Sequence, residues 1–79
     1  MSRYTKDLED GRLVTYGFDN ALGYFLDVFS TPDEKGIRKL LIEESSLLTK
    51  MSNGKMLELM EDYDLNESHR DKVAMDLAI

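Results

Sequence analysis

The sequence predicts an α+β fold, a three- or four-stranded antiparallel meander followed by two C-terminal helices packed on one face. Apolar and polar residues alternate in short runs, separated by turn signals, over the first part of the chain. After Met51 the apolar residues recur at helical spacing instead. Strands followed by helices, rather than alternating with them, are typical of α+β domains. We therefore expect one domain over residues 1–79, with the meander at 1–43 and a helical pair at 52–77.

Three strands are expected before residue 30. The first covers residues 2–8 and leads into a turn at Gly11, because glycine supplies the positive φ that a hairpin needs. The second covers about 12–18, and the apolar residues predicted to share one of its faces are Val14, Tyr16 and Phe18. The third covers about 24–29 and is apolar on both faces except at Asp27, as a central strand would be.

A loop over residues 30–36 contains the chain's only proline. A fourth strand is predicted at 37–43, with Leu40 and Ile42 on the same side. A short helix is the alternative there, because periodicity over so few residues decides poorly. We interpret residues 44–51 as a connection.

The helical pair has clear start signals. Ser52 is a plausible N-cap of the first helix, and Asn66 is a plausible N-cap of a second helix at about 67–76. The apolar stripe of the first helix consists of Met56, Leu59, Met60 and Tyr63. The predicted buried edge of the second consists of Val73, Ala74 and Leu77.

Composition excludes several functions. The chain has 79 residues, a net charge of −6 and no cysteine. This charge argues against direct binding to nucleic acid, which draws most of its affinity from Lys and Arg. The start of the chain carries no secretory signal, and no apolar run approaches the roughly 18 residues that a bilayer crossing needs. We expect a cytoplasmic protein that does not bind membranes.

No metal, cofactor or catalytic site is predicted. The first three ligand positions of an EF-hand loop are matched by Asp62, Asp64 and Asn66. That loop also needs Gly at its sixth position and a bidentate Glu at its twelfth, where this chain has Glu67 and Val73. His69 is the only histidine and is expected on an exposed helix surface, with neither a nucleophile beside it nor a second metal ligand at suitable spacing. The chain is therefore not expected to be an enzyme.

Asp27 interrupts the apolar third strand, and a lone buried carboxylate is costly. Either its face is partly exposed, or a cation on a neighbouring strand pairs with it, the candidates being Arg12, Arg38 and Lys39. Both interpretations make this side of the strand the less buried one. The functional alternative is an acidic spot within an aromatic contact surface.

Five of the seven aromatic residues lie between residues 13 and 29. Rings on adjacent strands also occur in RNA-binding sheets, but those are surrounded by Lys and Arg. We therefore predict non-catalytic protein binding or self-association, as in a dimer, through the aromatic sheet face that the helices leave open. The candidate contact residues are Tyr16, Phe18, Tyr24, Phe25, Asp27 and Phe29.

Residues 16–25 together with residues 55–60 resemble small uncharacterised bacterial proteins of plasmids, phages and other accessory elements. The resemblance implies a short acidic protein that binds and blocks a host protein, as anti-CRISPR inhibitors do. It transfers no functional residue. The alternative function is accordingly an acidic inhibitor that mimics nucleic acid and binds a basic protein surface. Its candidate residues are Glu58, Glu61, Asp62 and Asp64.

Overall fold

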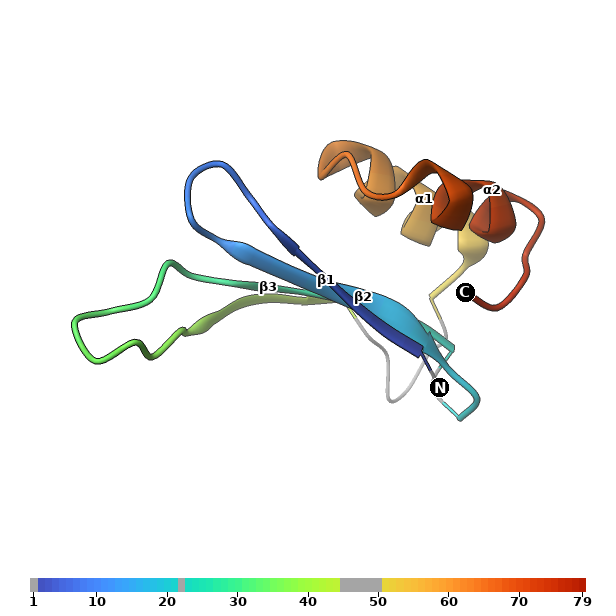
Figure 1. Ribbon diagram of the computed structural model, residues 1–79. Helices are drawn as coiled ribbons and strands as arrows, with labels where there is room; N and C mark the ends of the chain where they lie inside the picture. The colour runs from blue at the N-terminus through green and yellow to red at the C-terminus, as the bar shows by residue number, and fades with distance from the viewer. Residues whose placement is uncertain (1, 22, 45–50) are drawn as a thin grey trace.

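The structure, a computed structural model, describes residues 2–21, 23–44 and 51–79. Four strands form one antiparallel sheet in chain order, and two helices follow (Figure 1). The elements are β1 (Ser2–Asp7), β2 (Leu13–Asp19), β3 (Gly23–Phe29), β4 (Leu40–Glu44), α1 (Asn53–Asp62) and α2 (Glu67–Ala74). This arrangement confirms the predicted α+β meander, and the fourth segment is a strand rather than a short helix. Residues 45–50, most of the predicted connection, lie outside the described residues.

Both helices cover the same face of the sheet (Figure 1). Strand pairing sets Tyr4 beside Tyr16 and Tyr16 beside Leu26, so alternate residues of β1, β2 and β3 share that face. The core lies between this face and the helices, and the helices contribute Met56, Met60 and Val73, all without exposed surface. The other face, called the open face below, carries no helix or strand among the described residues.

Local signals account for the turns between the first strands. Gly11 has φ +93°, the positive region that favours glycine, and its amide donates to the Leu8 carbonyl at 3.0 Å. Gly23 has φ +84°, and the Asp19 carboxylate accepts from the Ala21 amide at 2.7 Å. The first hairpin therefore turns at the predicted glycine, and the second turns through a glycine and a turn-forming Asp.

Both predicted N-caps are confirmed. The Ser52 hydroxyl accepts from the Lys55 amide, and the Asn66 side chain accepts from the His69 amide, each at 3.1 Å. Each bond satisfies one amide that the first turn of a helix leaves without a partner. The caps fix where α1 and α2 begin.

The predicted buried edge of α2 is correct for Val73 and wrong for Ala74 and Leu77, which are exposed. The helix ends at Ala74, and Asp76 adopts a positive φ of +57° directly after it. The chain therefore turns before Leu77 can continue the helical face.

The prediction that Leu40 and Ile42 share a side of β4 is also wrong. Ile42 pairs with Val28 on the helix-covered face, whereas Leu40 pairs with Phe29 on the open face. A bulge at this point leaves Leu41 without a Cα partner on β3, so the alternation shifts by one residue.

Neither helix, among the residues described, has the length or apolar character that a bilayer crossing requires.

Candidate functional site

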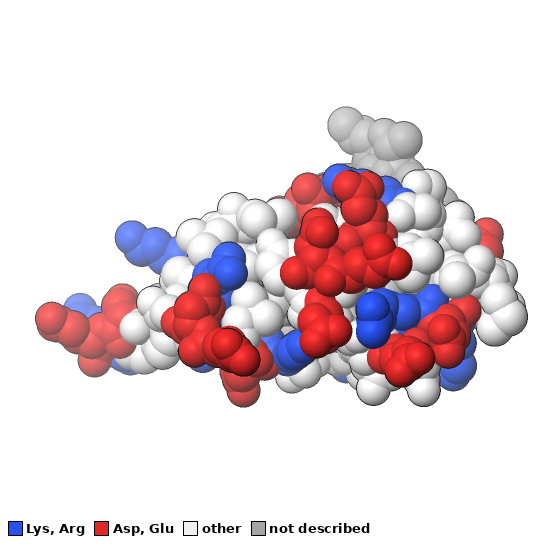
Figure 2. Space-filling view, turned by 90° about the horizontal axis from the view of Figure 1, so that it is seen from above, with Lys and Arg blue, Asp and Glu red and all other residues white. Residues whose placement is uncertain are grey.

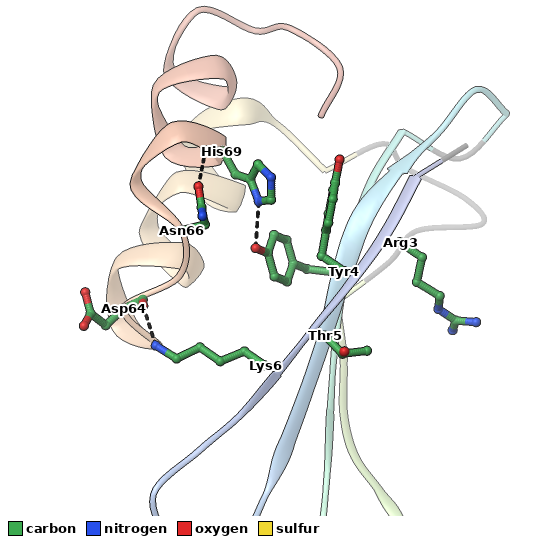
Figure 3. A pocket seen from close by; sticks show the side chains of 8 residues that line it. Arg3, Tyr4, Thr5, Lys6, Asp64, Asn66 and His69 are labelled. Atoms are coloured by element: carbon green, nitrogen blue, oxygen red, sulfur yellow. Dashed lines mark hydrogen bonds between the residues drawn. The ribbon is translucent and has the colours of Figure 1, made fainter.

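A polar cluster joins the sheet to the start of α2. The Tyr16 hydroxyl lies 2.8 Å from Nδ1 of His69, and the His69 ring stacks against Tyr4 with centroids 4.1 Å apart. Figure 3 shows His69 and Asn66 above β1, while Arg3 points away from the helices. Three aromatic side chains and an N-cap thus hold the N-terminal end of α2 on the sheet.

The electrostatics of this cluster favour neutral groups. Burial raises the pKa of Tyr16, with the backbone amide of Asn66 acting in the opposite direction. Burial lowers the pKa of His69, and the charge of Lys72 adds to this effect. A neutral phenol donating to an unprotonated Nδ1 satisfies both groups. The pair is therefore a hydrogen bond between neutral side chains.

An open depression of about 620 Å³ adjoins the cluster, between β1 and the corner that joins α1 to α2. Lys6 reaches across this corner and donates to the Asp64 carbonyl (Figure 3). It also donates to the Tyr63 carbonyl. Its ammonium group is thereby used to tie the sheet to the helices. The described residues contain no group of three or more metal-ligating side chains.

The expected exposed position of His69 is wrong, because the residue is half-buried between Tyr4 and Tyr16. A signal was present in the sequence. His69 lies four residues before Val73, so the two share a helix face, and Val73 was predicted to be buried. The charged residues next to His69 in the sequence led instead to the prediction of an exposed position.

The aromatic candidates divide between the two faces. Tyr16 and Tyr24 lie under the helices with 3% and 4% exposure, and Phe18 packs edge-on against Tyr24 with centroids 5.4 Å apart. The Tyr24 hydroxyl donates to the Leu77 carbonyl at 2.9 Å, and burial together with Asp76 raises the pKa of Tyr24 to about 12. These three rings belong to the core side, which removes Tyr16 and Tyr24 from the candidate contact residues.

Phe25 lies on the open face but is only 9% exposed. Its ring covers Gly17 on β2, where an added Cβ would lie 3.1 Å from Phe25 Cζ and would collide with the Ser2 carbonyl. The missing side chain at Gly17 leaves room for the ring at this position. Of the open-face rings, the half-buried Phe29 is therefore the more accessible.

Of the two interpretations of Asp27, partial exposure is confirmed, and no ion pair with Arg12, Arg38 or Lys39 forms among the described residues. The strand neighbours of Asp27 are Thr15 and Glu43, while Arg12 pairs with Asp10 at 2.7 Å and Arg38 donates to backbone carbonyls. Oδ1 of Asp27 is buried and accepts no hydrogen bond from any described residue. Burial raises the pKa of Asp27, and the nearby Glu43 carboxylate raises it further, with Arg3 acting in the opposite direction.

Exposed apolar side chains gather instead at the edge strand. We call this surface the β4 patch, and its residues, each between 37% and 59% exposed, are Ile37, Leu40, Leu41 and Ile42. Within the described part of the chain, β4 is the edge strand of the sheet and pairs with β3. Sequence reasoning placed a strand here but did not identify its apolar residues as a contact surface.

The four acidic candidates are all exposed at the surface of α1 and the turn after it. Seen from the helical side, acidic side chains form separate groups with basic side chains between them (Figure 2). Arg70 lies 3.8 Å from Asp64, which is one such contact. The acidic surface is therefore interrupted by cations.

Comparisons with protein-family models, with curated proteins and with solved structures found no match to this chain. The resemblance to proteins of bacterial accessory elements stays a prediction.

Proposed function

We propose that this protein acts without catalysis, by binding protein through the β4 patch. The observation that carries the proposal is the concentration of exposed apolar residues on a sheet edge. Exposed apolar side chains supply the hydrophobic area of a protein interface. Phe29, which pairs with Leu40, extends this surface onto the open face.

The only histidine supports a non-catalytic role. Nδ1 of His69 is engaged by Tyr16, and burial raises rather than lowers the pKa of that tyrosine. A phenol that acts as a nucleophile at neutral pH would need a lowered pKa instead. We assign the Tyr16–His69 pair to the fold.

The acidic alternative has one supporting observation, the exposure of Glu58, Glu61, Asp62 and Asp64. Binding through these residues would weaken steeply as salt rises, because exposed charges are screened. Binding through the β4 patch would be far less sensitive to salt. The salt dependence of a complex, once one is isolated, separates the two functions.

The proposal is tested by placing a photo-crosslinking amino acid at Leu41 in the full chain and irradiating cells that express it. The matched control carries the same group at Met75, which is 64% exposed and lies outside the β4 patch. We expect a discrete adduct from position 41 and much less from position 75. Equal adducts at both positions, or none at position 41, would overturn the proposal.

A further inference from the structure

We infer that Arg38 is a positioning residue for the β4 patch, because it fixes the connection between β3 and β4 before a partner binds. We call this connection, residues 30–39, the β3–β4 loop. Ile37, one of the four residues of the patch, lies in this loop, and Leu40 follows it directly. The inference rests on the proposed function, since it names the residue that prepares the same surface for binding.

The β3–β4 loop is held in one shape by its own hydrogen bonds. At its tip the Asp33 carboxylate accepts from the amides of Lys35 and Ile37 at 2.8 and 2.9 Å. At its base the Ser30 amide donates to the Lys39 carbonyl at 2.8 Å, and the Lys39 amide donates to the Ser30 hydroxyl at 2.9 Å. The loop is therefore a small hairpin that continues β3 and β4.

These internal bonds do not fix the direction in which the loop points. Figure 1 shows that it extends beyond the sheet at the end distant from both helices. The turn between β1 and β2, which contains Gly11, lies at the same end. A hairpin that projects from a sheet without a packing layer can bend where its two strands leave the sheet. A contact with the neighbouring turn is what can hold its direction.

Arg38 makes this contact. Its Nη1 donates to the Gly11 carbonyl at 2.8 Å and to the Ser30 carbonyl at 3.0 Å, so one nitrogen joins the first turn to the base of the loop. Hydrogen bonds from a charged donor are stronger than those between neutral groups. The Thr31 side chain lies close to the same turn, since a Cβ added to Gly11 would be 3.0 Å from Thr31 Cγ2. The guanidinium group therefore anchors the loop where the loop already meets the turn.

Neither hairpin needs Arg38 in order to close. The first turn closes through backbone bonds from Leu8 to Arg12 and from Gly11 to Leu8. The loop closes through the bonds between Ser30 and Lys39. Removing the guanidinium group should therefore leave both hairpins formed while freeing the direction of the loop. This difference favours a role in placing the loop over a role in folding.

The placement matters because apolar residues of the patch lie on both sides of Arg38 in the chain. Ile37 is 59% exposed and Leu40 is 48% exposed, whereas Arg38 is half-buried and bonded to the first turn. Binding to a mobile loop costs the free energy of ordering it, and a loop that is already fixed avoids this cost. Arg38 therefore strengthens binding at the β4 patch through the position of its neighbours.

The first measurement is NMR relaxation of the backbone amides in the full chain. The main variant, Arg38→Met, keeps an apolar side chain but removes the hydrogen-bond donors. In the parent, the amides of residues 33–37 should be as rigid as those of β3, with order parameters of about 0.85. In Arg38→Met they should fall to about 0.6, while the β3 amides keep the parent value. Arg38→Lys retains a charged donor and should lie between the two.

The second measurement is the yield of the adduct from the photo-crosslinking group at position 41, combined with each variant in cells. Arg38→Met should lower the yield about three- to tenfold, the range expected when a loop must be ordered on binding. Arg38→Lys should restore part of the yield. The matched control is Lys35→Met, which removes one positive charge from an exposed residue of the same loop. It should leave the order parameters and the yield at the parent values.

Unchanged order parameters in Arg38→Met, or an adduct yield equal to that of the parent, would overturn the inference. An equal fall in Lys35→Met would also overturn it, because the lost charge would then explain the effect. In each of these cases the parent still forms its adduct, and the proposed function stands. The absence of any adduct from the parent would overturn both. Urea denaturation should give every variant a midpoint near that of the parent, which shows that the fold is kept.

Discussion

Leu26 and Leu41 are the same residue type on neighbouring strands, yet one has no exposed surface and the other is 54% exposed. The difference follows from where the helices stop. The packed pairs of elements include α1 with β3, but neither helix with β4. Two short helices thus cover the inner strands of the sheet and leave the edge strand to solvent.

This contrast separates two uses of apolar residues in a small domain. Under the helices, Val14, Leu26 and Val28 are buried with methionines and supply the hydrophobic free energy of folding. At the edge, the β4 patch contributes little to the fold and remains available for association. Four substitutions, in order of decreasing effect, test the division.

The largest effect is expected from Met60→Ala, which removes a side chain without exposed surface. We expect it to lower the free energy of unfolding by about 2–5 kcal/mol. Leu41→Ala, the matched change in the β4 patch, should alter stability by less than about 0.5 kcal/mol. Urea denaturation at low protein concentration measures both, and equal losses would contradict the division.

The next largest effect concerns the open face, where Phe25 covers Gly17. Gly17→Ala should cost about 1–3 kcal/mol, because the added Cβ collides with the β1 backbone and crowds the ring. Gly54→Ala is the control, since no heavy atom lies within 4 Å of the added group, and it should leave stability unchanged or slightly higher. If Gly17→Ala left the stability unchanged, the rings of the open face would not be packed in solution.

A smaller effect is expected at the hydrogen bond between Tyr16 and His69. Tyr16→Phe should cost about 1 kcal/mol, because Nδ1 of His69 loses its partner. Since the folded-state pKa of His69 is lowered, the unfolded chain binds the proton first as pH falls. The stability from the neutral ring is therefore complete above about pH 6.5 and is lost as pH falls through the folded-state pKa.

Denaturation of the parent and His69→Gln between pH 7.5 and 5 measures this loss. The parent should lose stability faster than the variant over that range. Identical slopes would mean that His69 is as solvated in the folded chain as in the unfolded one.

The smallest effect is expected from Asp27→Asn, which should raise stability at pH 7 by up to about 1 kcal/mol after allowance for partial solvent screening. The pKa of Asp27 is raised in the folded state, so the stability from its protonated form is present below about pH 3.8 and lost as pH rises through the folded-state pKa. The gain from Asn should therefore disappear in acid. Asp7→Asn, an exposed change on the same face, should show no such gain.

Local signals predicted most of the fold. Gly11, Ser52 and Asn66 act through their own backbone or a bond to the next turn, so their neighbours in sequence suffice to identify them. The bulge in β4 depends on its pairing with β3, and the neighbours of Asp27 depend on register across three strands. Those relationships arise only when the strands meet, which is why the sequence left the surroundings of Asp27 open and assigned Leu40 to the wrong side of β4.

Functional residues were harder to predict for the same reason. Aromatic content identified β2 and β3 as unusual but could not tell which rings the helices would cover. The β4 patch was hidden because apolar residues in a strand are normally read as core. Its exposure depends on the reach of two helices that begin more than ten residues later.

The bonds that fasten the sheet to the helices also set an order of folding events. The Tyr16–His69 and Tyr24–Leu77 bonds each join residues 53 positions apart, and the Lys6 bond to Asp64 spans 58. During synthesis the first hairpin can form early, since its contacts are local. Its inner rings, however, stay uncovered until the second helix has left the ribosome. The nascent chain therefore passes through an interval in which both sides of the sheet are apolar and unprotected, when it is most prone to capture by chaperones or by other nascent chains.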